Sequence, residues 1–125
     1  MAVLLDTSVL IGAEARLAED AAISVVSLTE LHFGVLVARS EDARARRVLR
    51  LGAIEAHFDA LPFDAVAARE CGRLHAAVAQ RGGQPRRRAL DLAIAATANV
   101  QGVPLLTHNT EDFEIVADLV DVRGP

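Results

Sequence analysis

Lysine is absent from this chain of 125 residues, so its 13 basic side chains are all arginine. The absence excludes enzymes that form a Schiff base through lysine and P-loop proteins, whose loop carries a phosphate-binding lysine. It also argues against receiver domains, which place a lysine near the phosphate. The chemistry of this protein must therefore depend on acids, arginines, hydroxyl groups or imidazoles.

Cysteine and long apolar segments are also scarce. The one cysteine, Cys71, cannot form a disulfide within the chain, and its Ala-rich helical surroundings indicate a small packing residue. No stretch approaches the roughly 18 uninterrupted apolar residues of a membrane-spanning helix, and the run at 1–5 is too short for a signal peptide. We therefore expect a cytoplasmic protein that does not bind membranes.

The charge balance is acidic, with a net charge of −4. A passive nucleic-acid coat would normally show a basic face, which argues against that class. A metal-dependent enzyme that handles nucleic acid can still be acidic, because its cations offset the acids. With 52% hydrophobic residues, a chain of this length buries roughly two thirds of its unfolded surface. We expect one domain spanning residues 1–125.

Predicted strands and helices alternate along the chain without linkers or repeats. The expected strands lie at 3–6, 23–26, 58–61, 103–107 and 119–122. The expected helices begin near Ser8 and then span 28–40, 41–55, 64–82 and 90–100. Strands separated by helices predict an α/β fold, a three-layer αβα sandwich with a mainly parallel central sheet.

Asp6 closes the first apolar strand. In open α/β sheets the ligand crevice lies outside the carboxyl ends of the strands, so an acid at this position is well placed for chemistry. Asp6 and Thr7 could equally cap the next helix by accepting hydrogen bonds from its free amides. The residues alone leave both interpretations open.

Asp91 stands in a helical pattern that is apolar around most of its circumference, which predicts burial at the centre of the fold. An ionised carboxylate is costly there unless it is paired or bound to a metal. The ordinary partner would be Arg87 or Arg88, although a base placed before an acid at this spacing is the weaker orientation. A metal role is the interpretation we favour for Asp91.

Glu30 follows the second predicted strand, at the sheet edge where Asp6 is expected. The segment Ser27–Glu30 also matches a capping box, in which the two side chains satisfy helix-start amides. Both roles can coexist.

The last expected site lies where the strand at 103–107 ends in polar residues. Asn109 and Asp112 could form an Asx turn and a first-turn acid, or they could contribute to a site. His108 has no second His or Cys at ligand spacing, which argues against zinc. Phe113 is expected to fold back as an apolar anchor.

Four short motifs, in order along the chain, carry a family resemblance. They are LDTSVLI at 5–11, TELHFG at 29–34, DLAIAATA at 91–98 and LTHNTEDF at 106–113. With these residues the chain resembles the PIN-domain ribonucleases and, among them, the VapC-type toxins of prokaryotic toxin–antitoxin pairs. The resemblance implies a PIN-like parallel sheet, RNA cleavage dependent on Mg²⁺ with Mn²⁺ as a possible substitute, a homodimer, and inhibition by a cognate VapB-like antitoxin.

The resemblance also assigns residues. Asp6 and Asp91 match the family's metal ligands, and Glu30 matches its third acid. Some members have an aspartate where this chain has Asn109, whereas others have Asn followed three positions later by Asp-Phe, as here. Asn109 offers only a neutral carbonyl, so Asp112 must supply the fourth charge.

Phosphodiester hydrolysis needs an activated water and stabilisation of developing negative charge, which hard cations held by carboxylates can provide. Four crowded acids would repel one another without such cations. By hypothesis Asp6 and Asp91 hold Mg²⁺, while Glu30 and Asp112 orient its water or a second ion. The supporting polar residues would be Thr7, Ser8, Thr107 and Asn109.

Arg86, Arg87 and Arg88 lie just before Asp91. Exposed arginines are usually solvated or weakly paired. Beside a phosphate-cleaving centre, however, they could bind an RNA backbone. The helix at 28–40 carries more apolar side chains than one sheet contact needs, which would suit an antitoxin helix or a dimer.

Three other functions fit parts of the pattern. A phosphoacceptor domain would place acids at strand ends but would ordinarily need a lysine. A haloacid-dehalogenase-like phosphatase would have a second acid two residues after its aspartate, where this chain has Ser8. A catalytically silent binding module would tolerate Asn109 but would not require four acids.

Overall fold

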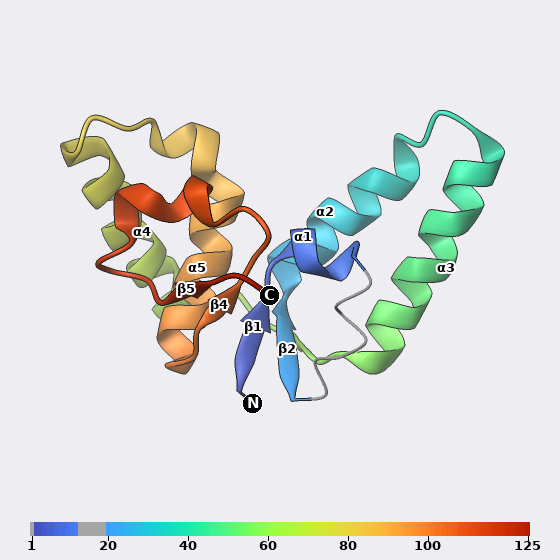
Figure 1. Ribbon diagram of the computed structural model, residues 1–125, viewed down its shortest axis with the longest axis horizontal. Helices are drawn as coiled ribbons and strands as arrows, with labels where there is room; N and C mark the ends of the chain where they lie inside the picture. The colour runs from blue at the N-terminus through green and yellow to red at the C-terminus, as the bar shows by residue number, and fades with distance from the viewer. Residues whose placement is uncertain (1, 13–19) are drawn as a thin grey trace.

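A five-stranded parallel sheet forms the centre of the protein, as the computed structural model shows for residues 2–12 and 20–125 (Figure 1). The strand order is β3-β2-β1-β4-β5, and every pairing is parallel. The strands are β1 (Val3–Leu5), β2 (Ala21–Ser24), β3 (Ala60–Leu61), β4 (Leu105–Leu106) and β5 (Val122–Arg123). The predicted α/β fold with a parallel sheet is confirmed.

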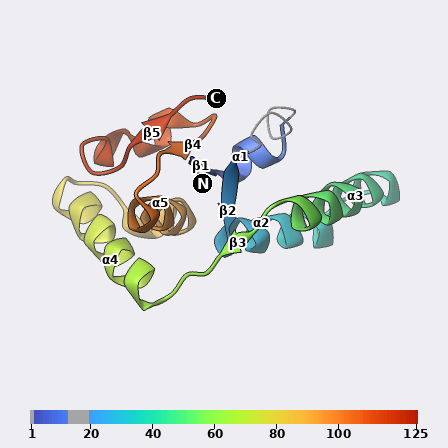
Figure 2. The ribbon, with the colours of Figure 1, turned by 90° about the horizontal axis from the view of Figure 1, so that it is seen from below.

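Helices cover both faces of the sheet and make three layers (Figure 2). One face is covered by α1 (Thr7–Leu10), α2 (Val25–Leu36) and α3 (Glu41–His57), and the other by α4 (Ala65–Gln80) and α5 (Ala89–Gln101). Two 3₁₀ helices complete the second side, η2 (Pro85–Arg88) and η3 (Thr110–Val116). The side chains of successive strand residues point to opposite faces of the sheet, so Leu4 packs with the α4–α5 core and Leu5 with the α1–α3 core.

The second strand and the helix after it differ from the prediction. The strand spans 21–24 rather than 23–26, because Ser24 Oγ accepts a hydrogen bond from the Val26 amide at 3.0 Å and caps α2. Ser27 and Glu30 therefore lie inside the helix. The predicted capping box of Ser27 and Glu30 is wrong, and it no longer explains why a glutamate stands at position 30.

The remaining boundaries agree with the prediction to within a few residues. Asp64 caps α4 by accepting a hydrogen bond from the Ala67 amide at 3.0 Å, and Cys71 is buried as expected. The last strand begins at Val122, whereas we expected it at 119–122. Residues 13–19, after the helix expected from Ser8, lie outside the described residues. No helix within the described ranges is long and apolar enough to cross a membrane.

The strand order creates a switch point between β1 and β4. The chain leaves β1 towards β2 on one side and leaves β4 towards β5 on the other. In open parallel sheets the ligand crevice forms where neighbouring connections diverge in this way, at the carboxyl ends of the strands. Asp6 directly follows β1, and Thr107 directly follows β4.

Candidate metal centre

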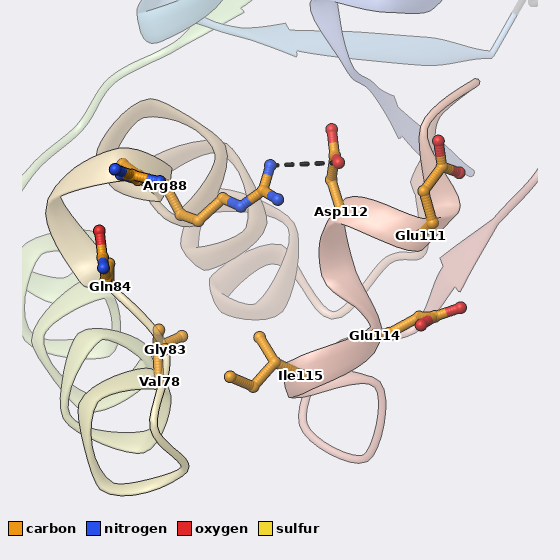
Figure 3. A pocket seen from close by; sticks show the side chains of 9 residues that line it. Val78, Gly83, Gln84, Arg88, Glu111, Asp112, Glu114 and Ile115 are labelled. Atoms are coloured by element: carbon orange, nitrogen blue, oxygen red, sulfur yellow. Dashed lines mark ion pairs between the residues drawn. The ribbon is translucent and has the colours of Figure 1, made fainter.

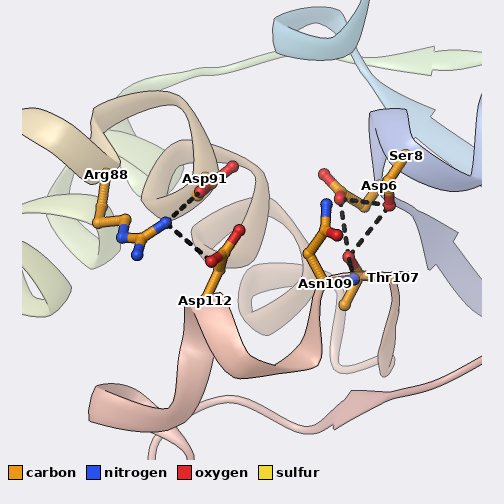
Figure 4. Close-up of polar contacts among 7 residues, drawn as sticks. All are labelled: Asp6, Ser8, Arg88, Asp91, Thr107, Asn109 and Asp112. Atoms are coloured by element: carbon orange, nitrogen blue, oxygen red, sulfur yellow. Dashed lines mark hydrogen bonds and ion pairs between the residues drawn. The ribbon is translucent and has the colours of Figure 1, made fainter.

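Asp6 is held at the switch point by two hydroxyl groups. Ser8 Oγ and Thr107 Oγ1 each donate a hydrogen bond to Asp6 Oδ2, both at 2.8 Å (Figure 4). The side chain makes no capping bond to α1, although Asp6 occupies the N-cap position. A capping role therefore does not explain this buried acid, which is 5% exposed.

Glu30 approaches Asp6 from α2 through Thr7. Thr7 Oγ1 donates to Glu30 Oε1 at 2.7 Å and also lies 3.0 Å from Ser27 Oγ. Burial raises the pKa of Glu30 above its ordinary value, the Thr7 hydrogen bond lowers it, and the negative charge of Asp6 raises it further. Two of the four acids are therefore close enough to repel each other.

Asp91 lies in the first turn of α5, where the negative charges of the other three acids act on it. Burial, followed by the negative charges of Asp6, Glu30 and Asp112 in that order, raises its pKa from 3.8 to about 6. The positive charge of Arg88 opposes the rise. The fold thus gathers the four predicted acids, from four separate segments, into one acid cluster.

Arg88 bridges two acids of this cluster. Its Nη1 lies 3.1 Å from Asp112 Oδ1 and 3.7 Å from Asp91 Oδ2 (Figure 4). The predicted alternative for Asp91, a pair with a nearby arginine, is present, but the contact is long and the Arg88 side chain is 41% exposed. The pKa of Asp91 stays raised despite this neighbour. An ordinary ion pair therefore does not neutralise the site.

Asn109 is the N-cap residue of η3, but its side chain makes no capping hydrogen bond. Its backbone N–H donates to Thr107 Oγ1 at 3.1 Å, which ties the start of η3 to the hydroxyl that bonds Asp6. Phe113, 2% exposed, anchors η3 in the core as expected and so places Asp112 beside Arg88.

The described residues contain no three His, Cys, Asp or Glu side chains that could hold a metal ion together as they stand. Three of the four acids instead bond a neighbour, since Asp6 accepts from hydroxyl groups, Glu30 accepts from Thr7, and Asp112 pairs with Arg88. The donor chemistry nevertheless fits a hard divalent cation, because the cluster consists of carboxylates, and burial together with the charges of the other three acids raises the pKa of Asp91. The guanidinium of Arg88 supplies part of the missing positive charge.

The chain matches the PIN domain over residues 3–119. It belongs to the PIN-domain family. Ribonuclease VapC5 of Mycobacterium tuberculosis is 40% identical to it over 117 residues, which cover 88% of this chain and 84% of VapC5. The predicted family membership is confirmed.

Solved structures of similar proteins agree with this PIN-domain fold. VapBC-5 of Mycobacterium tuberculosis, a member of the VapBC family of toxin–antitoxin systems, aligns with a TM-score of 0.83 and 36% identity over 99% of this chain and 98% of that chain. FitAcB of Neisseria gonorrhoeae aligns with a TM-score of 0.79 and 26% identity, over 96% and 95% of the two chains.

Two features of this PIN-domain site were not foreseen in the sequence. Ser27, expected as a helix cap, lies against Thr7 in the hydrogen-bonded group around Glu30. Arg88 was expected either to pair with Asp91 or to bind RNA with Arg86 and Arg87, but its shorter ion pair with Asp112, at 3.1 Å, was not expected. Its spacing of three residues from Asp91 signals only the pair with that acid.

Proposed function

We propose that this protein is a divalent-metal-dependent endoribonuclease that acts as the toxin of a toxin–antitoxin pair. The observation that carries the proposal is the convergence of four acids, from four separate segments, at the switch point of the sheet, where burial and the other three acids raise the pKa of Asp91. The similarity to VapC5, named a ribonuclease, supports RNA as the substrate. The similarity to VapBC-5 supports the role as a toxin.

Asp6 and Asp91 would hold Mg²⁺, with Mn²⁺ as a possible substitute. The bound cation would activate water and stabilise charge that develops on the phosphate. Both hydroxyl bonds to Asp6 use Oδ2, which leaves Oδ1 to face a cation. Glu30, whose pKa is raised, is suited to orient the attacking water and accept its proton, while Thr7 fixes the direction of the carboxylate.

Asp112 rather than Asn109 would complete the acid set. Asp112 contributes to the raised pKa of Asp91, so it lies within electrostatic reach of the cluster. Asp112→Asn should therefore weaken Mn²⁺ binding, measured by calorimetry, by a larger factor than Asn109→Ala. The reverse order would assign the fourth position to Asn109.

Arg86, Arg87 and Arg88 would bind the RNA backbone. They follow one another in η2, immediately before α5, and Arg88 reaches the acid cluster itself. A guanidinium forms charge-assisted hydrogen bonds to phosphate oxygens, and such contacts weaken as salt increases.

A VapB-like antitoxin and a second copy of the chain are the proposed protein partners, in the cytoplasm, with residues 1–125 as one domain. Large apolar side chains are exposed on neighbouring helices, including Phe33 and Leu36 on α2 and Leu49 on α3. Apolar surface of this kind supports association through these helices.

A metal titration of RNA cleavage tests the proposal. Wild-type protein should cut single-stranded RNA with added Mg²⁺ or Mn²⁺ and should stop in EDTA. Asp6→Asn and Asp91→Asn should each lose at least about 100-fold in rate, the scale of a lost metal or transition-state contact. Asp42→Asn, at an exposed acid of α3, is the matched control.

Cleavage that persists in EDTA, or at an unchanged rate in both site variants, would contradict the proposal. No cleavage of any RNA at any divalent concentration would instead favour the catalytically silent binding module, for which Asn109 is the supporting residue.

A further inference from the structure

A pocket of about 570 Å³ lies beside the acid cluster, where the end of α4 and η2 face η3 (Figure 3). This volume falls within the range of about 300–1,000 Å³ that is usual for small-molecule sites. Val78 and Ile115 contribute apolar side chains, and Gln84 and Arg87 contribute polar ones. Figure 3 shows the side chains of Glu111 and Glu114 directed away from Gln84 and Arg88. The pocket therefore combines apolar surface, the hydrogen-bond donors of Gln84 and Arg87, and the carboxylates of η3 that line its other wall.

The pocket is already formed in the free protein. The Gly83 amide donates to the Val78 carbonyl at 2.9 Å, and a Cβ at Gly83 would come within 2.7 Å of both Val78 Cγ1 and Ile115 Cδ1. Arg81 Nη1 donates to the Ile115 carbonyl and to Asp118 Oδ1, both at 2.7 Å, and so ties the end of α4 to η3. A ligand would not have to order these segments, which lowers the cost of binding.

The pocket and the acid cluster share two residues, Arg88 and Asp112. Their ion pair, at 3.1 Å, forms the boundary between the two sites. A polynucleotide whose phosphodiester lies at the acids would therefore bring a neighbouring nucleotide to the pocket. Arg88 is placed to contact the phosphate between them.

The lining favours one class of base. A glutamine side chain makes paired hydrogen bonds to N6 and N7 of adenine, and an arginine does so to O6 and N7 of guanine, so both residue types recognise an edge that only purines have. Gln84 and Arg87 supply these two groups. Ile115 supplies apolar contact for the face of the base, and the buried Val78 lies behind it.

We propose that this pocket binds the purine base of an unpaired nucleotide next to the cleaved phosphodiester, with Gln84 and Arg87 recognising its edge. Of the three arginines of η2, Arg86 and Arg88 then remain for the RNA backbone. The inference rests on the proposed function in taking RNA as the substrate. A base stacked in a duplex could not enter the pocket, so the substrate is single-stranded at this position.

Titration of nucleoside monophosphates tests the pocket without requiring cleavage. In ¹⁵N-labelled protein without metal, AMP or GMP should shift the amide signals of Gly83, Gln84 and Ile115 and should bind roughly tenfold tighter than CMP and UMP, which corresponds to about 1.4 kcal/mol. Gln84→Ala and Arg87→Ala should remove this difference. Equal binding of all four nucleotides, or shifts confined to other residues, would overturn the proposal.

Cleavage of a randomised single-stranded RNA with Mn²⁺ tests the same pocket in the working enzyme. Sequencing of the cut ends should show a purine at one position beside the cleaved bond, and Gln84→Ala and Arg87→Ala should each reduce that preference at least about fivefold. Arg86→Ala is the matched control, because Arg86 does not line the pocket. It should slow the cutting of all sequences alike and leave the preference intact.

A preference that survives in both pocket variants would overturn the proposal. If the wild-type protein cut no RNA, the proposed function would fail instead, and the nucleotide titration would still decide whether the pocket binds purines.

Discussion

Replacement of Asp91 by asparagine should stabilise the metal-free protein while it destroys the proposed metal site. The carboxyl group has a pKa of about 6 instead of 3.8, because it is partly buried and faces negative charges from Asp6, Glu30 and Asp112. At 1.36 kcal/mol per pKa unit, the charged form costs the native state about 3 kcal/mol. Water reaches the side chain, which is 29% exposed, so we expect a net gain of about 1–2 kcal/mol in the variant.

The pH dependence has a definite sign. Because the pKa of Asp91 is raised on folding, the native state holds this proton more tightly than the unfolded chain does. The free energy of unfolding therefore falls as the pH rises from about 4 to about 6, and the loss is complete above that range. An asparagine side chain does not titrate, so the Asp91→Asn variant should lack this decline.

Thermal and urea unfolding in EDTA measure the effect. At about pH 7.5, Asp91→Asn should melt roughly 4–8 °C above the wild type, at about 4 °C per kcal/mol for a chain of this size, and the difference should shrink towards zero near pH 4. Added Mn²⁺ should stabilise the wild type but not the variant. Asp42→Asn should behave as the wild type does. A variant that is less stable than the wild type near pH 7.5, or that keeps the same pH slope, would refute the reasoning.

Thr107→Val removes one of the two hydroxyl groups that bond Asp6 Oδ2. RNA cleavage should therefore fall about 10–100-fold, while RNA binding in EDTA should stay unchanged. An unaltered cleavage rate would show that Ser8 alone orients the acid. Arg88→Ala removes a cation that competes for Asp91 and Asp112, so calorimetry should find tighter Mn²⁺ binding than in Arg86→Ala, and weaker binding would contradict this role. Leu74→Ala empties a fully buried position and should cost about 2–5 kcal/mol in urea unfolding, whereas a cost below about 1 kcal/mol would mean that the core closes around the gap.

The most predictable part of the fold was α5, because its apolar side chains surround the helix. Residues 92–98 are all buried, since the sheet lies on one side of α5 and α4 on the other. A carboxylate next to such a segment must lie at the edge of the core, and this is where Asp91 is found. The strand ends that carry Asp6 and Thr107 were predictable for a similar reason, because short apolar runs ended in polar residues.

The start of α2 was not predictable from local pattern. Ser24 and Ser27 are both good capping residues, and the β-branched Val25 and Val26 between them favour a strand. The use of Ser24 as the N-cap of α2 fits the parallel pairing of β2 with β3. In this pairing Ser24 is the last paired residue of β2, opposite Leu61. That pairing joins residues far apart in the chain, so no local pattern reveals it.

The direction of Arg88 was only partly visible in the sequence, in which Arg87 and Arg88 are equal candidates for a pair with Asp91. Three successive arginines look equivalent, but a 3₁₀ helix has about three residues per turn, so adjacent side chains point in different directions around its axis. Arg88 consequently turns towards the acid cluster, while Arg86 and Arg87 stay exposed. Roles for such residues therefore have to be assigned one at a time.

The hydrogen bond from Thr107 to Asp6 spans 101 positions of the polypeptide. A nascent chain that has not yet been extended past Leu105 lacks both this clamp on Asp6 and the carboxylate of Asp112. Under the proposed function, RNA cleavage would begin only after the segment that carries Thr107 and Asp112 has been synthesised and has folded against Asp6.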